Sequence, residues 1–137
     1  MPKSTPISIM EAFAKTRFLA NRKPTTAKNE SKDAFAILSE FRDGAIFIAN
    51  YAGNSEWERH SQGDELVMII EGETRLLLWE ANQEKSHQQK QGELLVVPQN
   101  IWHRFETANG VKALFITPQP TDHRLSHPSE ASNSSIQ

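Results

Sequence analysis

The sequence predicts an all-β domain, a sandwich or a barrel, because of where its glycines lie and what separates them. All six glycines fall between Gly44 and Gly110, with successive gaps of 9, 10, 9, 20 and 18 residues. Glycine supplies the positive φ that tight turns need, and turn signals about every 8–12 residues are typical of sandwiches and barrels. The segments between the glycines contain short runs of β-branched and aromatic residues, which favour strands.

The first 43 residues predict a helix, a loop and an accessory strand that pack on the barrel. Ser8 and Glu11 have the spacing of a capping box, and apolar side chains from Met10 to Phe18 recur at helical spacing. We therefore expect one short N-terminal helix. The polar residues 21–33 predict a loop, and residues 34–41 favour an additional strand.

Residues 44–117 predict the barrel itself. The apolar runs that favour strands cover residues 45–51, 66–70, 74–79, 94–97 and 111–117. Gly72 lies between the second and third runs, so these two predict a hairpin, and Asn109-Gly110 before the last run is a strong hairpin-turn signal. Pro98 and Pro118 end the strands that precede them, because proline cannot donate to a central ladder.

Residues 118–137 predict a C-terminal tail that is largely flexible. The segment contains Pro120, Pro128 and many serines, a composition that favours disorder from about Pro128 onward. His123 and His127 lie in this tail, and we expect them to be solvated, although a tail that folds back would place His123 over the barrel mouth.

Length, charge and composition exclude several classes of function. The chain has 137 residues, enough for one domain, and a formal net charge of -2 without a basic block, which argues against a nucleic-acid partner. No apolar run approaches the roughly 20 residues of a membrane helix, and residues 1–18 lack the apolar stretch of a secretory signal. The absence of cysteine excludes disulfides and thiolate chemistry. We therefore expect a cytoplasmic protein without a membrane partner.

Two stretches concentrate the side chains that carry chemistry. Glu58 and His60 are two residues apart, so on a strand they point to the same face. Glu65 follows a turn around Gly63 and opens the next strand, and a further imidazole, His103, follows the second stretch. Two histidines with carboxylates suit a divalent first-row metal, and two imidazoles with one carboxylate and open positions are typical of non-haem Fe(II) sites.

These stretches resemble the two motifs of the cupin family over roughly residues 45–117. The positions that keep the spacing of the motifs are His60, Glu65 and Gly72 in the first and Gly92, Pro98 and His103 in the second. The resemblance implies an antiparallel double-stranded β-helix, the jelly-roll barrel of cupins, often dimeric, with a metal held by inward-facing side chains. By this resemblance His60, Glu65 and His103 inherit metal-ligand roles.

The sequence departs from the family pattern at three positions. Glu58 stands where the family has its first metal-binding histidine, Asn100 replaces the glycine of Pro-x-Gly, and Thr107 replaces the final asparagine. Asparagine tolerates the left-handed conformation, so Asn100 can still form the turn. Glu58 inherits only the position: it either coordinates the metal or acts as a catalytic general base. The cofactor we expect is Fe, Mn, Ni or Zn, and two carboxylate ligands would favour Mn or Fe(II).

The sequence favours a metal-dependent enzyme, an oxygenase or an isomerase or lyase acting on a small molecule, in a homodimer. One alternative is a cupin that binds a small ligand without catalysis, since a fold does not fix a function. Another is a metal-free sugar epimerase, which would need Tyr51, the only tyrosine, at the site. Phe105 shares the strand parity of His103 and is the better aromatic candidate for the pocket, whereas Trp57 and Trp102 are expected in the core.

Overall fold

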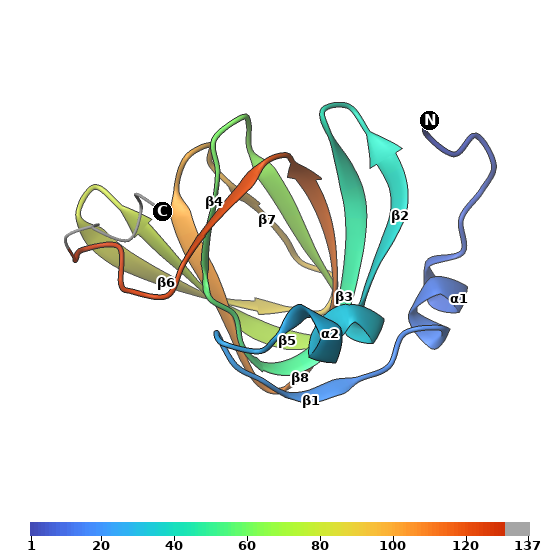
Figure 1. The fold of residues 1–137 in the computed structure, drawn as a ribbon, viewed down its shortest axis with the longest axis horizontal. Coiled ribbons are helices and arrows are strands. Elements are labelled where there is room, and N and C mark those ends of the chain that lie inside the picture. Colours follow the sequence, from blue (N-terminus) through green and yellow to red (C-terminus); the bar gives the residue numbers. More distant parts are fainter. Residues whose placement is uncertain (131–137) are drawn as a thin grey trace.

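Nine strands form the architecture of residues 1–130, the part of the chain that the computed structural model describes (Figure 1). In chain order they are β1 (Leu19–Arg22), β2 (Phe35–Phe41), β3 (Gly44–Asn54), β4 (Trp57–His60), β5 (Glu65–Glu80), β6 (Gln83–Lys90), β7 (Leu94–Val97), β8 (Trp102–Pro118) and β9 (Thr121–Arg124). Two short α-helices, α1 (Ile9–Ala14) and α2 (Lys28–Ser31), and a 3-10 turn (Lys32–Ala34) complete the fold. The all-β prediction with a short N-terminal helix is confirmed.

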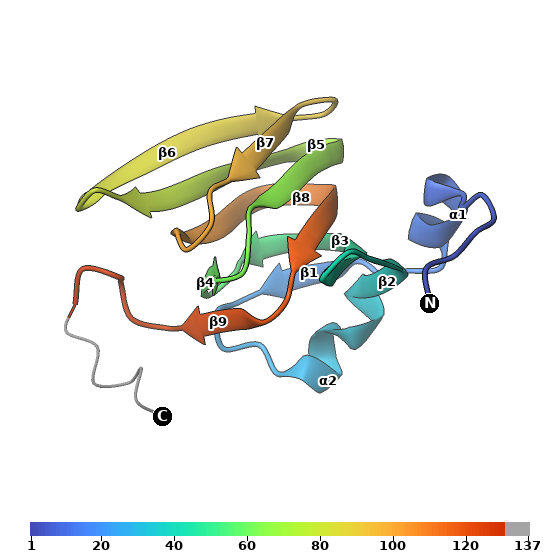
Figure 2. The same ribbon diagram turned by 90° about the horizontal axis from the view of Figure 1, so that it is seen from above.

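Strand β8 is the centre of the sheet. It pairs antiparallel with β3 on one edge and with β5 on the other. The N-terminal half of β5 also pairs with β7 and its C-terminal half with β6, whereas β1 and β2 pair with β3. Figure 2 shows β5, β6 and β7 in one layer and β1, β3, β4 and β9 in the other, so the bent sheet folds over on itself as a jelly roll.

Two predicted hairpin turns, at Gly72 and at Asn109-Gly110, are wrong. At both positions the chain bends within one long strand. β5 continues through Gly72 and β8 continues through Gly110, so residues 66–70 and 74–79 both pair with β8 and not with each other. Both glycines have positive φ, +81° and +108°, and a Cβ on Gly72 would overlap the carbonyl oxygen of Gly110. The glycines therefore permit two adjacent strands to bend at the same level, which local sequence cannot distinguish from a turn.

The N-terminal segment contains more secondary structure than the sequence predicted. Helix α1 begins as expected after Ser8, whose Oγ accepts a hydrogen bond from the backbone N–H of Glu11. Phe13 is buried against β2, β3 and β8, but Met10 is 82% exposed, so the apolar face of the helix is narrower than its spacing implied. The expected accessory strand is β2. The expected loop over residues 21–33 contains α2 and the end of β1, which pairs parallel with β3.

The segment expected to be a largely flexible tail contains β9. This strand pairs antiparallel with β4 and crosses beside it in Figure 1. The predicted disorder falls mostly on residues 131–137, which lie outside the described residues. Within residues 1–130 no helix is long and apolar enough to cross a membrane.

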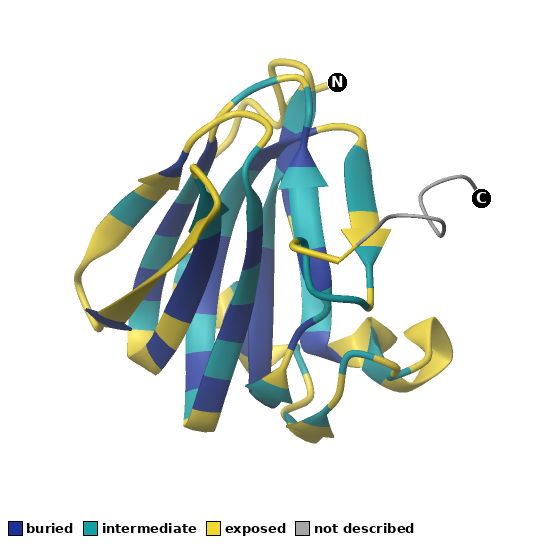
Figure 3. Cartoon of the chain, turned by 90° about the vertical axis from the view of Figure 1, so that its left-hand side faces the viewer, coloured by how far each residue is buried: buried dark blue, intermediate teal, exposed yellow. Residues whose placement is uncertain are grey.

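The core lies between the two layers and continues into the site. Buried residues alternate with more exposed ones along the long strands in Figure 3, the pattern of a sheet with one face inward. The inner apolar cluster includes Tyr51, Val67, Leu76, Val97 and Phe105. Three ionisable side chains are buried beside this cluster, which requires that they satisfy one another or a bound ion.

Candidate metal centre

His60, Glu65 and His103 converge, as the sequence predicted. Nε2 of His103 lies 3.1 Å from Oε1 of Glu65, and Nε2 of His60 lies 3.3 Å from Oε2 of the same carboxylate. One ligand atom from each residue lies within 4.8 Å of the others. The side chains are almost fully removed from solvent, with 4% of His60, 4% of Glu65 and none of His103 exposed.

Three different strands bring these residues together. His60 ends β4, Glu65 begins β5 after the turn at Gly63, and His103 lies near the start of β8. Asn100 adopts the expected left-handed conformation, with φ of 68°. Its N–H donates to the carbonyl oxygen of His60 at 2.8 Å, which ties the loop before β8 to the end of β4.

Hydrogen bonds behind the cluster orient each of its members. Nδ1 of His103 lies 3.0 Å from the carbonyl oxygen of Ile101, so Nδ1 carries the proton and Nε2 faces Glu65. Nδ1 of His60 shares a hydrogen bond of 3.0 Å with the hydroxyl of Thr121 in β9. The hydroxyl of Thr117 donates to Oε2 of Glu65 at 2.6 Å. Such outer partners, which fix ring orientation and tautomer, are typical of metal-binding histidines and carboxylates.

The electrostatics of the cluster favour a charged carboxylate. Burial opposes ionisation of Glu65, but the neighbouring imidazoles of His103 and His60 outweigh it and lower its pKa to about 2. Burial also opposes the charged form of His103, which would lower its pKa. The hydrogen bond and the charge of Glu65 outweigh this effect and raise the pKa of His103. A buried anion is therefore fixed between two imidazoles at neutral pH.

One atom of the cluster is unsatisfied, and a cation fits it. Nε2 of His60 is buried and has no hydrogen-bond partner among residues 1–130, although the Glu65 carboxylate is only 3.3 Å away. Buried polar atoms are almost always paired, so an orphaned one needs an explanation. A divalent cation between the carboxylate and the two Nε2 atoms would satisfy all three, and two nitrogens with one oxygen suit Fe, Mn, Ni or Zn.

The cluster lies at the wall of a cavity of about 400 Å³. The side chains that line it come from both layers and both ends of the chain: Arg22, Phe35, Phe47, Glu58, His60, Glu65, Phe105, Phe115, Thr117, Gln119, Pro120, Thr121 and His123. A volume of this size is within the usual range of small-molecule sites. The cluster therefore has a space beside it in which a small molecule fits.

Glu58 lies in this cavity but apart from the three-residue cluster. It shares the cavity with His60, as the same-face prediction required, and its side chain is 21% exposed. Oε2 of Glu58 lies 3.7 Å from Nδ1 of His123, and that nitrogen lies 2.9 Å from Oε1 of Glu56. His123 was expected to be solvated, yet it lies in β9 and its half-exposed ring lines the cavity.

The aromatic expectations are partly confirmed. Phe105 lines the cavity, whereas Trp57 is buried against His127 and Trp102 is covered by the guanidinium of Arg59, both away from the cavity. Tyr51, the residue that epimerase chemistry would need, belongs to the core and is not among the cavity-lining residues. Burial raises the pKa of its phenol to about 12, against the opposing charge of Arg22.

Sequence reasoning missed several cavity residues, among them Arg22, Phe35, Thr117 and Thr121. Arg22 and Phe35 come from the segment expected to contain only a loop and an accessory strand, and Thr121 comes from the tail expected to be flexible. No motif marks them in the sequence. Thr117 alone had a signal, because it ends an apolar strand with a hydroxyl.

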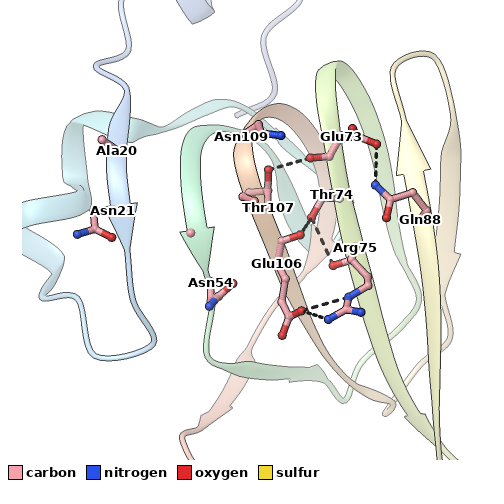
Figure 4. A pocket seen from close by; sticks show the side chains of 12 residues that line it. Ala20, Asn21, Asn54, Glu73, Thr74, Arg75, Gln88, Glu106, Thr107 and Asn109 are labelled. Carbon is pink, nitrogen blue, oxygen red and sulfur yellow. Dashed lines mark hydrogen bonds and ion pairs between the residues drawn. The ribbon is translucent and has the colours of Figure 1, made fainter.

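A second cavity, of about 590 Å³, lies between β1, β3, β5 and β8 (Figure 4). Its polar side chains bind one another: the Arg75 guanidinium donates to Glu106, Gln88 donates to Glu73, and the Thr107 hydroxyl donates to the Glu73 carbonyl oxygen. These groups are already paired, so this cavity lacks the unsatisfied atoms that distinguish the one beside His60.

Comparisons with known proteins agree with this fold. Residues 47–117 match a family model described as "Cupin domain". An uncharacterized protein of Bacillus subtilis, YdbB, is 31% identical over 78 residues, which cover 56% of this chain and 66%, slightly under two thirds, of that protein.

Two solved structures share the fold at low sequence identity. The structure of hydroquinone 1,2-dioxygenase PnpCD in complex with Cd2+ and 4-hydroxybenzonitrile has a TM-score of 0.53 at 16% identity, and the match covers 61% of this chain and 63% of that one. A deletion mutant of Bacillus subtilis oxalate decarboxylase OxdC also has a TM-score of 0.53, at 15% identity. The match covers 58% of this chain and 23% of that one. At these identities the likeness concerns the fold alone.

Proposed function

The chain belongs to the cupin family, and from this premise we propose that it is a metal-dependent enzyme that acts on a small molecule, as an oxygenase or as an isomerase or lyase. In this proposal His60, Glu65 and His103 are the protein ligands of one divalent cation. The observation that carries it is the buried, unpartnered Nε2 of His60, which faces the Glu65 carboxylate beside a cavity.

Hydrogen bonding alone does not account for the three side chains. Nε2 of His103 lies within hydrogen-bond distance of one oxygen of Glu65, and the Thr117 hydroxyl donates to the other. Nε2 of His60 is then left without a partner among the described residues, at a cost of about 1–3 kcal/mol for a buried polar atom. A cation removes this cost, because each imidazole offers it a lone pair while its Nδ1 keeps its partner.

Three protein ligands leave coordination positions for a substrate. A bound divalent ion would act as a Lewis acid and would hold the reacting molecule in the cavity. The donor set of two imidazoles and one carboxylate favours Fe(II), with Mn(II), Ni(II) and Zn(II) as further candidates. The residues of the cavity would exclude water and orient that molecule.

We assign Glu58 the role of catalytic general base rather than of a fourth ligand. It lines the cavity from the same strand as His60 but is absent from the group of side chains whose ligand atoms lie within 4.8 Å. Its carboxylate is half-buried and can accept a proton from a molecule beside the cluster. His123, 3.7 Å from it, provides a neighbour that can pass this proton toward the cavity mouth.

Elemental analysis of the protein purified without a histidine tag tests the metal assignment. We expect about one transition-metal ion per chain, and we expect His103→Ala to lose it during dialysis. His87→Ala is the matched control, because His87 is an exposed histidine of β6 outside the cluster. Unchanged metal content in the His103→Ala protein would refute the site.

A substrate screen separates the enzyme from a binding protein that has the same centre. Turnover of any small molecule by protein loaded with Fe(II), Mn(II), Ni(II) or Zn(II) supports catalysis. Binding without turnover across all four loaded forms would favour the non-catalytic alternative.

We also propose that residues 44–117 form the barrel and that both flanking segments contribute to it.

We further propose that two copies of the chain associate as a homodimer. Large apolar side chains are exposed on β2 and β7, namely Ile37, Leu94 and Val96. A second copy would cover such surface. Light scattering would show twice the 15.5 kDa of the single chain, and a monomer at micromolar concentration would contradict the proposal.

A further inference from the structure

We propose that the small molecule bound beside this centre is a carboxylate with a ring, and that the guanidinium of Arg22 binds its carboxylate group. This inference rests on the proposed function, because it names the class of substrate for the same site. It is carried by the position of Arg22 in the cavity, by the aromatic walls around it and by the balance of charge.

The guanidinium of Arg22 packs on aromatic rings but forms no ion pair with a carboxylate of residues 1–130. Its Cζ lies 4.6 Å from the ring centroid of Tyr51 and 4.9 Å from that of Phe35, so the guanidinium packs over two aromatic rings. It lines the cavity together with His60 and Glu65. Among residues 1–130 no carboxylate forms an ion pair with it. A fixed guanidinium presents a fork of N–H donors that matches a carboxylate in two parallel hydrogen bonds.

The backbone of the protein is built to hold Arg22 in this place. Arg22 ends β1, opposite Gly53 of β3. Gly53 has φ of +118°, and a Cβ on it would overlap the backbone oxygen of Arg22. The parallel strand that delivers the arginine therefore approaches β3 more closely than any side chain at position 53 would permit.

The walls of the cavity favour a flat, apolar body for the ligand. Four phenylalanines from β2, β3 and β8 line the same cavity as Arg22 and the cluster: Phe35, Phe47, Phe105 and Phe115. Aromatic side chains prefer ring partners in stacked or edge-to-face contact. A cavity of about 400 Å³ holds a substituted benzene ring with room to spare.

The charges in the cavity favour a monoanion more strongly when the metal is present. With a divalent ion, the charges of the ion and Arg22 exceed those of Glu58 and Glu65 by one positive charge. Without the ion, the positive charge of Arg22 is opposed by these two carboxylates. Binding of the carboxylate and binding of the metal are therefore coupled, and each strengthens the other.

Arg22 lies outside the part of the chain that matches the family model, which begins at residue 47. Recognition of the carboxylate is thus assigned to a strand that precedes the matched domain. The ligands of the metal all lie within that domain, so the two functions can be separated by mutation.

Calorimetric titration of protein loaded with Zn(II), an ion that does not change oxidation state, tests the proposal. The probes are benzoate and phenylacetate, with benzamide and phenylacetamide as neutral counterparts of the same shape. We expect each carboxylate to bind at least about tenfold more tightly than its amide, since a charge-assisted pair is worth more than a neutral hydrogen bond. Arg22→Gln should remove this preference without changing zinc content or amide binding.

Two further variants keep the experiment decisive. Arg75→Gln removes an arginine that pairs with Glu106 away from this cavity and should leave carboxylate binding unchanged. Arg22→Lys keeps the charge without the planar fork and should give an intermediate affinity. Circular dichroism and zinc content identify any Arg22 variant that has misfolded. If Arg22→Gln misfolds, carboxylate affinity is compared between the wild type and Arg22→Lys.

The outcomes separate this inference from the proposed function. Equal affinity for benzoate in the wild-type and Arg22→Gln proteins, equal affinity for acid and amide, or no carboxylate binding by zinc-bearing protein would each overturn the role of Arg22. If the wild type retains no metal, the proposed function fails, and carboxylate binding that still depends on Arg22 would preserve the substrate class. Absence of both would overturn both.

Discussion

Thr121 Oγ1 lies 3.0 Å from Nδ1 of His60, although the two residues are 61 positions apart in the chain. The contact forms because β9 pairs antiparallel with β4, which places Thr121 directly opposite His60. With Nδ1 engaged by the hydroxyl, Nε2 of the ring points toward Glu65. The C-terminal strand therefore sets the orientation of a residue at the centre of the barrel.

Replacing Thr121 by valine should weaken metal binding without unfolding the protein. Valine keeps the shape and removes the hydroxyl, so the ring of His60 loses its partner at Nδ1. Loss of such an outer partner typically lowers metal affinity by about tenfold to a hundredfold. Competition titration with a chromogenic zinc chelator measures the change.

Thr5→Val is the matched control for this measurement, because Thr5 is exposed near the N-terminus and lies far from the cluster in sequence. Equal zinc affinity in Thr121→Val and Thr5→Val would show that the contact with His60 does not influence the metal.

Glu58→Gln and Glu65→Gln should separate the two carboxylates of the site. Both changes remove a negative charge and keep the size of the side chain. Glu65→Gln should lose the metal, because Glu65 is buried between both histidines. Glu58→Gln should change metal affinity by less than about tenfold, the lower end of what an outer partner contributes. Metal content after dialysis measures both, and loss of metal from Glu58→Gln would instead make Glu58 a ligand.

The stability of protein stripped of metal should depend on pH through Glu65 and His103. The pKa of Glu65 falls from 4.5 to about 2, so its contribution is present above pH 4.5 and is lost as pH falls toward 2. The pKa of His103 is raised above 6.5, so its contribution is present below pH 6.5 and is lost as pH rises through the raised value. The pair therefore stabilises the metal-free protein most between about pH 4.5 and 6.5.

Urea denaturation at several pH values measures this effect as the difference between the wild-type and His103→Gln proteins. The difference should decrease on the acid side as Glu65 becomes protonated, and on the basic side as His103 loses its proton. A difference that is the same at pH 3, 5.5 and 8.5 would contradict the coupling.

Gly53→Ala should destabilise the protein much more than Gly92→Ala, although both glycines have positive φ. At position 92 a Cβ meets nothing within 4 Å, so only the backbone strain of about 1–2 kcal/mol remains. At position 53 a Cβ overlaps the backbone of Arg22, and the expected loss exceeds about 3 kcal/mol. Urea midpoints compare the two variants, and equal midpoints would mean that β1 moves aside without cost.

The sequence predicted the cluster correctly because its spacing is anchored locally. His60 and Glu65 lie on either side of the turn at Gly63, and His103 follows the turn at Asn100, and both turn residues are visible in the chain. The same glycine signals misled at Gly72 and Gly110. There the choice between a turn and a bent strand depends on pairing between β5 and β8, which local sequence does not encode.

The cavity residues outside the motifs could not be predicted for a related reason. Arg22 and Thr121 reach the site through strands of only four residues, β1 paired with β3 and β9 paired with β4. Strands that short have no periodicity to detect, and their position is decided by tertiary pairing with Gly53 and His60. Chemistry supplied by such segments becomes visible only in three dimensions.

The parallel attachment of β1 has a practical meaning for protein engineering. Four consecutive residues, Leu19–Arg22, can be exchanged as a cassette while the cluster of His60, Glu65 and His103 is left untouched. A library confined to this cassette, with Gly53 retained, would sample new charge preferences beside an unaltered cluster.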